Sequence, residues 1–284
     1  MGKVYDALQR AEEARSRLAP GGVAAAPTAE WKPSVEVEKA RRAPFWKRWF
    51  QRTALLREED ASAANKRRIS LLEPDSFVAE QYRTLRTRIE SLAAQRPLRT
   101  LAVVSALPGE GKTSAAVNLA VVSEMHLDRR VLLVDCDLRK PKIHRALGIT
   151  PQAGLAEVLQ DKATIEQAIT RVEGPAFEGG ALEVLPVAGQ PPNPSELLSS
   201  AKMRALIEEL ARRYDFVILD TPAALSLPDA KTVTELADGA LLVVRADVTP
   251  DEDVETALDL LDRRRVIGLV LNGSDLDQTY YGYR

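Results

Sequence analysis

The stretch "SALPGEGKTSAAVNLA" at residues 105–120 joins an apolar run to a segment of helical composition. Gly109 and Gly111 allow backbone N–H groups to turn inward around phosphate oxygens, and Lys112 supplies a cation for the outer phosphates. The hydroxyl of Thr113 is suited to Mg²⁺. Because a Gly-Lys-Thr sequence between a strand and a helix is the usual setting of a P-loop, the stretch predicts nucleotide binding.

Further apolar runs rich in Val, Ile and Leu alternate with helix-like stretches at residues 112–125, 199–213 and 251–264. Nearly continuous apolar strands are typical of a parallel sheet that is buried on both faces. The sequence therefore predicts an α/β fold with a mostly parallel sheet covered by helices on both faces. The predicted strands are "LAVVSA", "VLLVD", "LEVLPV", "FVILD", "ALLVV" and "VIGLVLN".

Three carboxylates follow two of these strands directly. Asp135 and Asp137 end the run "VLLVDCD", and Asp220 ends "FVILD". In a parallel sheet these ends share the edge that carries the P-loop, where ligands bind. Because a metal ion offsets their mutual repulsion, three carboxylates at this edge predict a site for Mg²⁺ and ATP.

Charge and composition exclude several classes of protein. The 284 residues are 45% apolar and carry a formal charge of −2, with an excess of Lys and Arg before residue 70 and of Asp and Glu after it. An acidic body argues against nucleic acid as a partner. Cys136 is the only cysteine, which fits a reducing compartment. We expect a cytoplasmic protein, since no apolar run is long enough to span a bilayer.

The chain is expected to have four parts. A short amphipathic helix over residues 1–19 precedes a Pro/Ala/Gly-rich linker over 20–68. Within the linker, residues 41–52 mix aromatic and basic side chains, which suits either a membrane surface or partner, or a segment packed on the main domain. The main domain covers 69–274, and a flexible tail with tyrosines covers 275–284.

A helix is predicted after Asp75 or Ser76, either of which can cap it. Its apolar residues step by four and three, as in an amphipathic helix. They are Val78, Tyr82, Leu85, Ile89 and Leu92.

Three motifs together resemble those of the bacterial tyrosine kinases. "SALPGEGKTS", "VLLVDCDLRKP" and "FVILDTPA" are similar to the Walker A, Walker A′ and Walker B motifs of that family, although Ala106 replaces the first P-loop glycine. The likeness also covers "EQYRTLRTRI", "GLAEVL", "PPNPSELLSS" and "ADGALLVV". It implies a P-loop NTPase fold and a kinase that regulates the synthesis and export of capsular and extracellular polysaccharide.

The resemblance also implies roles for individual residues. Lys112 holds phosphate, and Thr113, Asp135 and Asp220 hold Mg²⁺. Asp137 orients or deprotonates the attacking tyrosine hydroxyl, so the implied catalytic set is Lys112, Asp135, Asp137 and Asp220. Asn272 matches an adenine contact, with a simple strand-end turn as the alternative. The expected nucleotide contacts are Pro108, Gly109, Glu110, Gly111, Lys112, Thr113, Ser114 and Asn272.

The resemblance further implies assembly and self-modification. Glu80, Arg83 and Arg86 match the family's E-x-x-R-x-x-R element, which predicts a ring-like homo-oligomer; a solvated helix face is the alternative. The C-terminal tyrosines are expected to be phosphorylated by a neighbouring copy, unless they form an unmodified aromatic end. These residues are Tyr280, Tyr281 and Tyr283.

The family implies a separate transmembrane polysaccharide co-polymerase, or activator, that recruits this chain to the inner face of the membrane. Two other functions remain open at this point. One is an ATPase switch of the MinD/ParA type, although Leu107 stands where that group carries its signature lysine. The other is a catalytically silent adaptor that binds ATP and signals by assembly.

Overall fold

The computed structural model describes residues 69–126, 129–177 and 180–274. The predicted N-terminal helix, the linker with its basic aromatic stretch and the tyrosine tail lie outside the described residues. Within the described ranges, no helix is both long and apolar enough to cross a membrane.

A seven-stranded sheet forms the centre of the fold, in the order β3-β4-β2-β5-β1-β6-β7. Every pairing is parallel except that of the edge strand β3 with β4. All residues of β1, β2 and β5 are buried, as expected for strands covered on both faces. The strands are β1 Thr100–Ser105, β2 Val131–Asp135, β3 Thr170–Val172, β4 Leu182–Leu185, β5 Phe216–Asp220, β6 Gly239–Arg245 and β7 Val266–Asn272.

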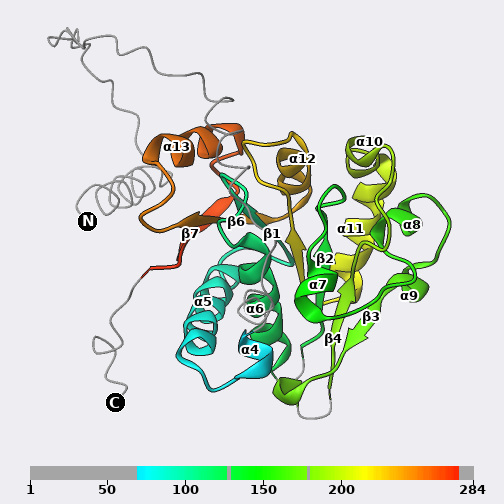
Figure 1. The fold of residues 1–284 in the computed structure, drawn as a ribbon, viewed down its shortest axis with the longest axis horizontal. Coiled ribbons are helices and arrows are strands. Elements are labelled where there is room, and N and C mark those ends of the chain that lie inside the picture. Colours follow the sequence, from blue (N-terminus) through cyan, green and yellow to red (C-terminus); the bar gives the residue numbers. More distant parts are fainter. Residues whose placement is uncertain (1–68, 127–128, 178–179, 275–284) are drawn as a thin grey trace, which may run out of the picture. The chain divides into compact units, whose positions relative to one another are not determined.

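Helices cover both faces of the sheet (Figure 1). On one face, α6 packs with α5 and with alternate strand residues such as Leu101 and Val103. On the other, α11 packs with the intervening residues, including Ala102 and Leu132. The longer helices are α5 Phe77–Ala93, α6 Lys112–Glu124, α11 Ala201–Arg213, α12 Asp229–Leu236 and α13 Asp251–Leu260. The shorter ones are α4 Ile69–Leu72, α7 Ile143–Leu147, α8 Leu155–Leu159, α9 Ile165–Ala168, the 3₁₀ turn η1 Pro175–Phe177 and α10 Pro194–Leu198.

The structure confirms the predicted helix at the start of the domain and corrects one of its contacts. Ser76 caps α5, since its side chain accepts a hydrogen bond from the backbone N–H of Ala79. Tyr82, Leu85 and Ile89 pack on the core as predicted. Val78 is exposed instead, and Ala79 is buried in its place. The buried stripe is therefore rotated by one residue at the first turn.

The sheet order places the loops that follow β1, β2 and β5 next to one another. The strand β1 lies between β5 and β6, and β5 lies between β1 and β2. Asp135 and Asp220 end adjacent strands and are direct register partners. The carboxyl ends of β1, β2 and β5 therefore form one contiguous edge, at which the predicted site residues converge.

Candidate active site

The loop between β1 and α6 has the backbone of a phosphate cradle. Gly109 and Gly111 both have positive φ, 88° and 96°, which only glycine adopts without strain. Gly111 stands at the N-cap of the 13-residue helix α6 and provides no side-chain cap. The first N–H groups of α6 are thus available to an anion, which the helix dipole also favours.

The last strand closes one side of this loop. The side-chain amide of Asn272 donates to the backbone oxygen of Glu110 at 2.8 Å. A Cβ built on Gly111 would lie 1.9 Å from the same amide nitrogen, so the position has no room for a larger residue. Asn272 therefore borders the loop directly.

Glu110 has a supporting role that sequence reasoning missed. Its carboxylate accepts the backbone N–H of Leu107 at 2.6 Å and the hydroxyl of Thr249, and only 3% of the residue is exposed. Burial raises the pKa of Glu110 above its usual range, while these hydrogen bonds act against the rise. The side chain thus ties the P-loop to the loop after β6. The motif's spacing contains no signal for such a tertiary contact.

Two of the three predicted carboxylates lie at the base of the cradle, next to the first turn of α6. The hydroxyl of Thr113 donates to Oδ2 of Asp220 at 2.7 Å. Asp135 accepts the backbone N–H of Asp137 at 3.1 Å and that of Ile143 at 3.2 Å. All three side chains predicted to hold a metal are therefore brought together.

Asp137 lies at the opening of the same site. Its Oδ2 is 3.9 Å from the Nζ of Lys112, and 8% of the residue is exposed. Its Oδ1 accepts the backbone N–H of Lys140 at 3.0 Å, which fixes the orientation of the carboxylate. This carboxylate can therefore meet an incoming group while Lys112 stays within reach of phosphate.

The electrostatics of the cradle favour a bound cation. Burial and then the neighbouring Asp220 raise the pKa of Asp135 well above its ordinary value. Burial likewise raises the pKa of Asp220, against the lowering effect of Lys112. Oδ1 of Asp220 is buried without any hydrogen-bond partner. A hard cation at this oxygen would satisfy it and stabilise both ionised carboxylates.

These residues fit Mg²⁺ bound together with a nucleotide. Among the described residues, no group of three His, Cys, Asp or Glu side chains is arranged to hold a metal alone. Mg²⁺ ordinarily uses one or two carboxylates plus substrate phosphates, with water completing its shell. Asp135, Asp220 and the Thr113 hydroxyl match that donor set.

A second network, which the sequence analysis did not predict, fixes the loop after β2. Arg139 donates through Nε to Asp229 at 2.9 Å and through Nη2 to Ser195 at 2.8 Å. Ser195 also donates to Asp229 at 2.5 Å. Three separate loops meet here, so sequence spacing could not reveal the contact.

The predicted assembly residues divide into two groups on α5. Arg83 pairs with Glu80 at 2.9 Å, and their side chains are 27% and 42% exposed. Arg86 instead turns onto α6, where its Nη1 donates to the backbone oxygen of Val122 at 2.7 Å. Arg86 therefore holds two helices of one subunit together.

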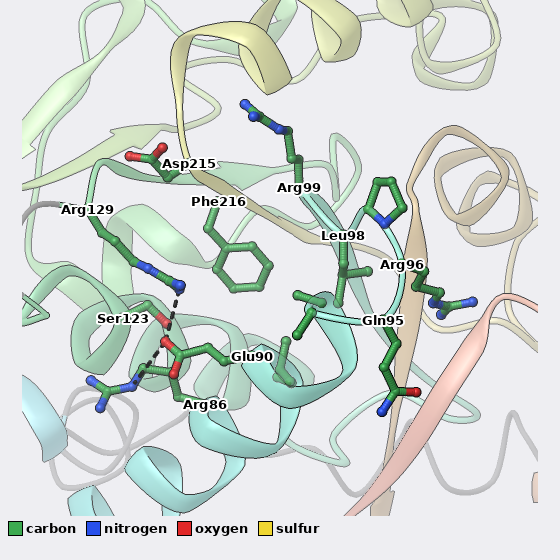
Figure 2. Close-up of a pocket in the computed structure, with 14 residues that line it drawn as sticks. Arg86, Glu90, Gln95, Arg96, Leu98, Arg99, Ser123, Arg129, Asp215 and Phe216 are labelled. Atoms are coloured by element: carbon green, nitrogen blue, oxygen red, sulfur yellow. Dashed lines mark hydrogen bonds and ion pairs between the residues drawn. The ribbon is translucent and has the colours of Figure 1, made fainter.

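Arg86 also lines a cavity of about 770 Å³ at the opposite edge of the sheet, where β1 and β5 begin. Figure 2 shows Glu90 between Arg86 and Arg129, with Leu98 and Phe216 on the apolar side. Glu90 accepts from Arg129 at 2.9 Å. None of the predicted catalytic or nucleotide-binding residues lines this cavity.

The parallel sheet, the glycine-rich cradle and the buried carboxylates define a P-loop nucleotide-binding protein. The AAA-domain family model matches residues 98–262. The tyrosine-protein kinase YwqD of Bacillus subtilis (strain 168) is 39% identical over 231 residues, covering 80% of this chain and 95% of YwqD. The chain belongs to the bacterial tyrosine-protein kinases of the capsular and extracellular polysaccharide family, as the sequence predicted.

Solved structures agree with this assignment. The kinase domain of Escherichia coli tyrosine kinase ETK is 30% identical, with a TM-score of 0.67 over 83% of this chain and 91% of that one. The chimerical protein CapA2B2 is 29% identical, with a TM-score of 0.66 over 72% of this chain and 88% of that one. Both likenesses confirm the α/β P-loop fold with its mostly parallel sheet.

Proposed function

We propose that this chain is an Mg²⁺- and ATP-dependent protein-tyrosine autokinase that phosphorylates its C-terminal tyrosines in trans and so regulates polysaccharide synthesis and export. One observation carries the proposal. The Asp137 carboxylate stands 3.9 Å from Lys112 at the opening of a phosphate cradle. A carboxylate at this opening can accept the proton of an attacking hydroxyl. The similarity to tyrosine-protein kinases favours a tyrosine over water as the source of that hydroxyl.

The chemistry follows from the positions of these groups. The tyrosine oxygen attacks the γ-phosphorus, the bond to the β-phosphate oxygen breaks, and Asp137 takes the hydroxyl proton. Lys112 and the N–H groups at the start of α6 neutralise charge on the transferred phosphoryl group and on departing ADP. Thr113, Asp135 and Asp220 would hold Mg²⁺, which would supply positive charge to offset the repulsion between the phosphates. Asn272 closes the nucleotide side of the cradle, where adenine is expected.

The geometry of the sheet supports the tail as the acceptor. The strand β7 ends at Asn272, which touches the P-loop backbone. From Asn272 to Tyr280 is eight residues, which span at most about 26–29 Å when extended. Tyr280, Tyr281 and Tyr283 can thus approach a neighbour's site, and each phosphate adds about −1.5 to −2 charge. That charge, close to three carboxylates, would drive the tail away and loosen the assembly.

Self-assembly through α5 rests on Glu80 and Arg83. Their side chains are partly exposed, so a neighbouring subunit can reach them. They pair with each other, and Arg83 also donates to the backbone oxygen of Pro74 at 2.7 Å. Arg86 is more buried, at 18% side-chain exposure, and we assign it to α5–α6 packing within the subunit. A ring-like homo-oligomer would bring each tail to the next subunit's cradle.

A membrane partner would place the kinase where polysaccharide is made. The relative ETK is named a tyrosine kinase, and the other similar structure is that of a chimerical protein, CapA2B2. We propose a cytoplasmic kinase recruited to the inner face of the membrane by a transmembrane co-polymerase or activator. Residues 41–52 are the proposed contact, because they combine aromatic and basic side chains.

A mixing experiment tests the kinase and its trans mechanism together. Lys112→Met protein with an intact tail is mixed with active protein whose three tail tyrosines are Phe, in Mg-ATP with membranes that contain the partner. Phosphotyrosine is then mapped by mass spectrometry. We expect phosphate on the tail of the inactive copy only. An unmodified tail in the presence of ATP turnover would contradict the trans mechanism, and an absence of ATP turnover would favour the silent adaptor.

A further inference from the structure

A basic segment follows the catalytic carboxylate Asp137 directly. Residues 139–145, "RKPKIHR", contain four Lys or Arg residues and no acid. The backbone N–H of Lys140 donates to Asp137 at 3.0 Å, and that of Lys142 donates to Asp135 at 3.2 Å. The segment therefore wraps around the site at which an acceptor tyrosine would arrive.

One of these four cations, Arg139, holds the segment in place. Arg139 is fixed by Asp229, of which only 2% is exposed, and by Ser195. The side-chain amide of Gln190 also donates to the backbone oxygen of Arg139 at 2.6 Å. The start of the segment is therefore anchored on two sides, which lowers the entropy cost of presenting its other side chains to a ligand.

Two further cations are exposed beside this anchor. The side chains of Lys140 and Arg145 face solvent, and neither has an ion-pair partner among the described residues. Many other surface arginines of the domain do have one, for example Arg213 with Glu166 and Arg263 with Glu255. These two exposed cations, in the segment that follows Asp137, are therefore available to an acidic ligand.

The chain's own C-terminus contains matching acids. In "GSDLDQTYYGYR", Asp275 and Asp277 lie five and three residues before Tyr280. The main domain has a net negative charge, because residues 70–284 contain 24 Lys or Arg against 32 Asp or Glu, so it offers such a segment little attraction overall. The basic segment is an exception within an acidic body.

We propose that Lys140 and Arg145 recognise the aspartates that precede the tyrosines on the tail of a neighbouring copy. This inference rests on the proposed function, in which the tail is the acceptor. Ion pairs at these two positions would set the register of the peptide, so that a tyrosine a few residues further on meets Asp137. Arg139 is the positioning residue that holds the segment.

The sheet order favours a neighbour's tail over the chain's own. Four strand spacings separate β2 from β7, about 19 Å at about 4.8 Å each. Asp275 lies three residues beyond Asn272, a reach of at most about 10–11 Å. A tail from another copy has no such tether and can bring both aspartates to the segment at once.

A peptide assay tests the recognition step separately from catalysis. The enzyme is full-length protein with all three tail tyrosines changed to Phe, and the substrate is a synthetic peptide of residues 273–284. A second peptide has Lys in place of Asp275 and Asp277. We expect KM for the second peptide to be about threefold to tenfold higher, as for two exposed ion pairs, with kcat and KM for ATP unchanged.

Charge reversal on the enzyme completes a double-mutant cycle. Lys140→Glu and Arg145→Glu should each raise KM for the native peptide and lower it for the lysine peptide. Arg212→Glu is the matched control, because Arg212 is also exposed without an ion-pair partner in the described region, on α11. The differences should shrink in 0.5 M salt, where charges are screened over a few ångströms.

The outcomes separate this inference from the function on which it rests. Equal KM values for the two peptides, or equal effects of Lys140→Glu and Arg212→Glu, would overturn the recognition role and leave the kinase intact. No phosphate on the native peptide, with an enzyme that still turns over ATP, would overturn the tail as acceptor and this inference with it.

Discussion

The charged side chains at the two edges of the sheet differ in how they are paired. At the edge where the strands end, Asp135, Asp137 and Asp220 lie near two cations, Lys112 and Lys142, and among the described residues Oδ1 of Asp220 has no hydrogen-bond partner. At the edge where the strands begin, Glu90 lies between Arg86 and Arg129 and contacts both. The first edge therefore has an excess of negative charge and is suited to a cation, whereas at the second edge Glu90 is paired with arginines of the protein.

This difference indicates that the charged residues at the first edge serve ligand binding, whereas those at the second edge serve packing. Buried like charges raise the free energy of the folded state, so their presence needs a compensating ligand. Paired charges at the other edge need none, although that edge has the cavity of about 770 Å³. The presence of a cavity therefore does not by itself mark the edge at which a nucleotide is expected to bind.

The largest expected effect is at Asp137. Asp137→Asn removes the proposed proton acceptor while keeping the shape of the side chain, so we expect kcat for autophosphorylation to fall about 10²- to 10⁴-fold. Nucleotide affinity should be unchanged, measured by fluorescence titration. Asp215→Asn is the control, because Asp215 accepts the backbone N–H of Arg130 at the opposite edge. If the two variants lose activity equally, the contrast between the edges is wrong.

Asp220→Asn should change stability in opposite directions with and without ligand. Without metal, removing one of two adjacent buried carboxylates should raise the free energy of unfolding by about 1–2 kcal/mol. With Mg-ADP, the wild-type protein should gain Tm and the variant should gain little, because binding stabilises only a competent site. Thermal unfolding with and without Mg-ADP measures both. A variant that is less stable without metal would show that the carboxylate pair serves packing.

Arg86→Ala tests the other edge. The change leaves the backbone oxygen of Val122 without its side-chain donor and removes one of the two arginines next to Glu90. We expect a loss of about 1–3 kcal/mol in the free energy of unfolding, measured by urea denaturation.

Arg83→Ala is the matched comparison on the same helix. The pair of Arg83 with Glu80 is more exposed, so stability should change by less than about 1 kcal/mol while self-association weakens in sedimentation. We infer that Arg86 serves packing within the subunit and Arg83 serves assembly. Weaker assembly of Arg86→Ala without any loss of stability would contradict this inference.

The sequence predicted the sheet edge well because its signals are local. A P-loop, a strand-end carboxylate and an apolar strand are each contained in a few residues, and a parallel sheet brings strand ends together whatever the rest of the chain does. Lys112, Thr113, Asp135, Asp137 and Asp220 were all predicted on that basis and lie in one site.

The missed features are contacts between loops that are distant in sequence. Glu110 meets Thr249 across 139 residues, and Arg139 meets Asp229 across 90. The exposed position of Val78 was missed for a different reason, since helical periodicity fixes a stripe only to within one residue at a capped end. Arg86 has the spacing of a surface residue, and only the approach of α6 shows that it serves packing.

The smallest expected effect is at Glu110. This buried carboxylate lies in the P-loop, at the same edge as Asp220, but it accepts hydrogen bonds from the protein. Its pKa is raised by burial. The folded state therefore binds its proton more tightly than the unfolded state does. The wild-type protein should lose stability as pH rises from about 4.5 through the raised pKa, and the loss should then level off.

Glu110→Gln lacks this titration and can still accept from Leu107 and contact Thr249. We expect the two proteins to be similar below pH 4.5 and the variant to be more stable, by less than about 1 kcal/mol, at pH 8. Thermal unfolding across this pH range in metal-free buffer measures the difference. Thr249→Val serves as the control, because it removes the hydroxyl contact and keeps the carboxylate, so it should steepen the same pH dependence. If the difference in stability between wild type and Glu110→Gln did not change with pH, Glu110 would carry no buried charge in the folded protein. Asp135 and Asp220 would then be the pair of carboxylates on which the contrast between the two edges depends.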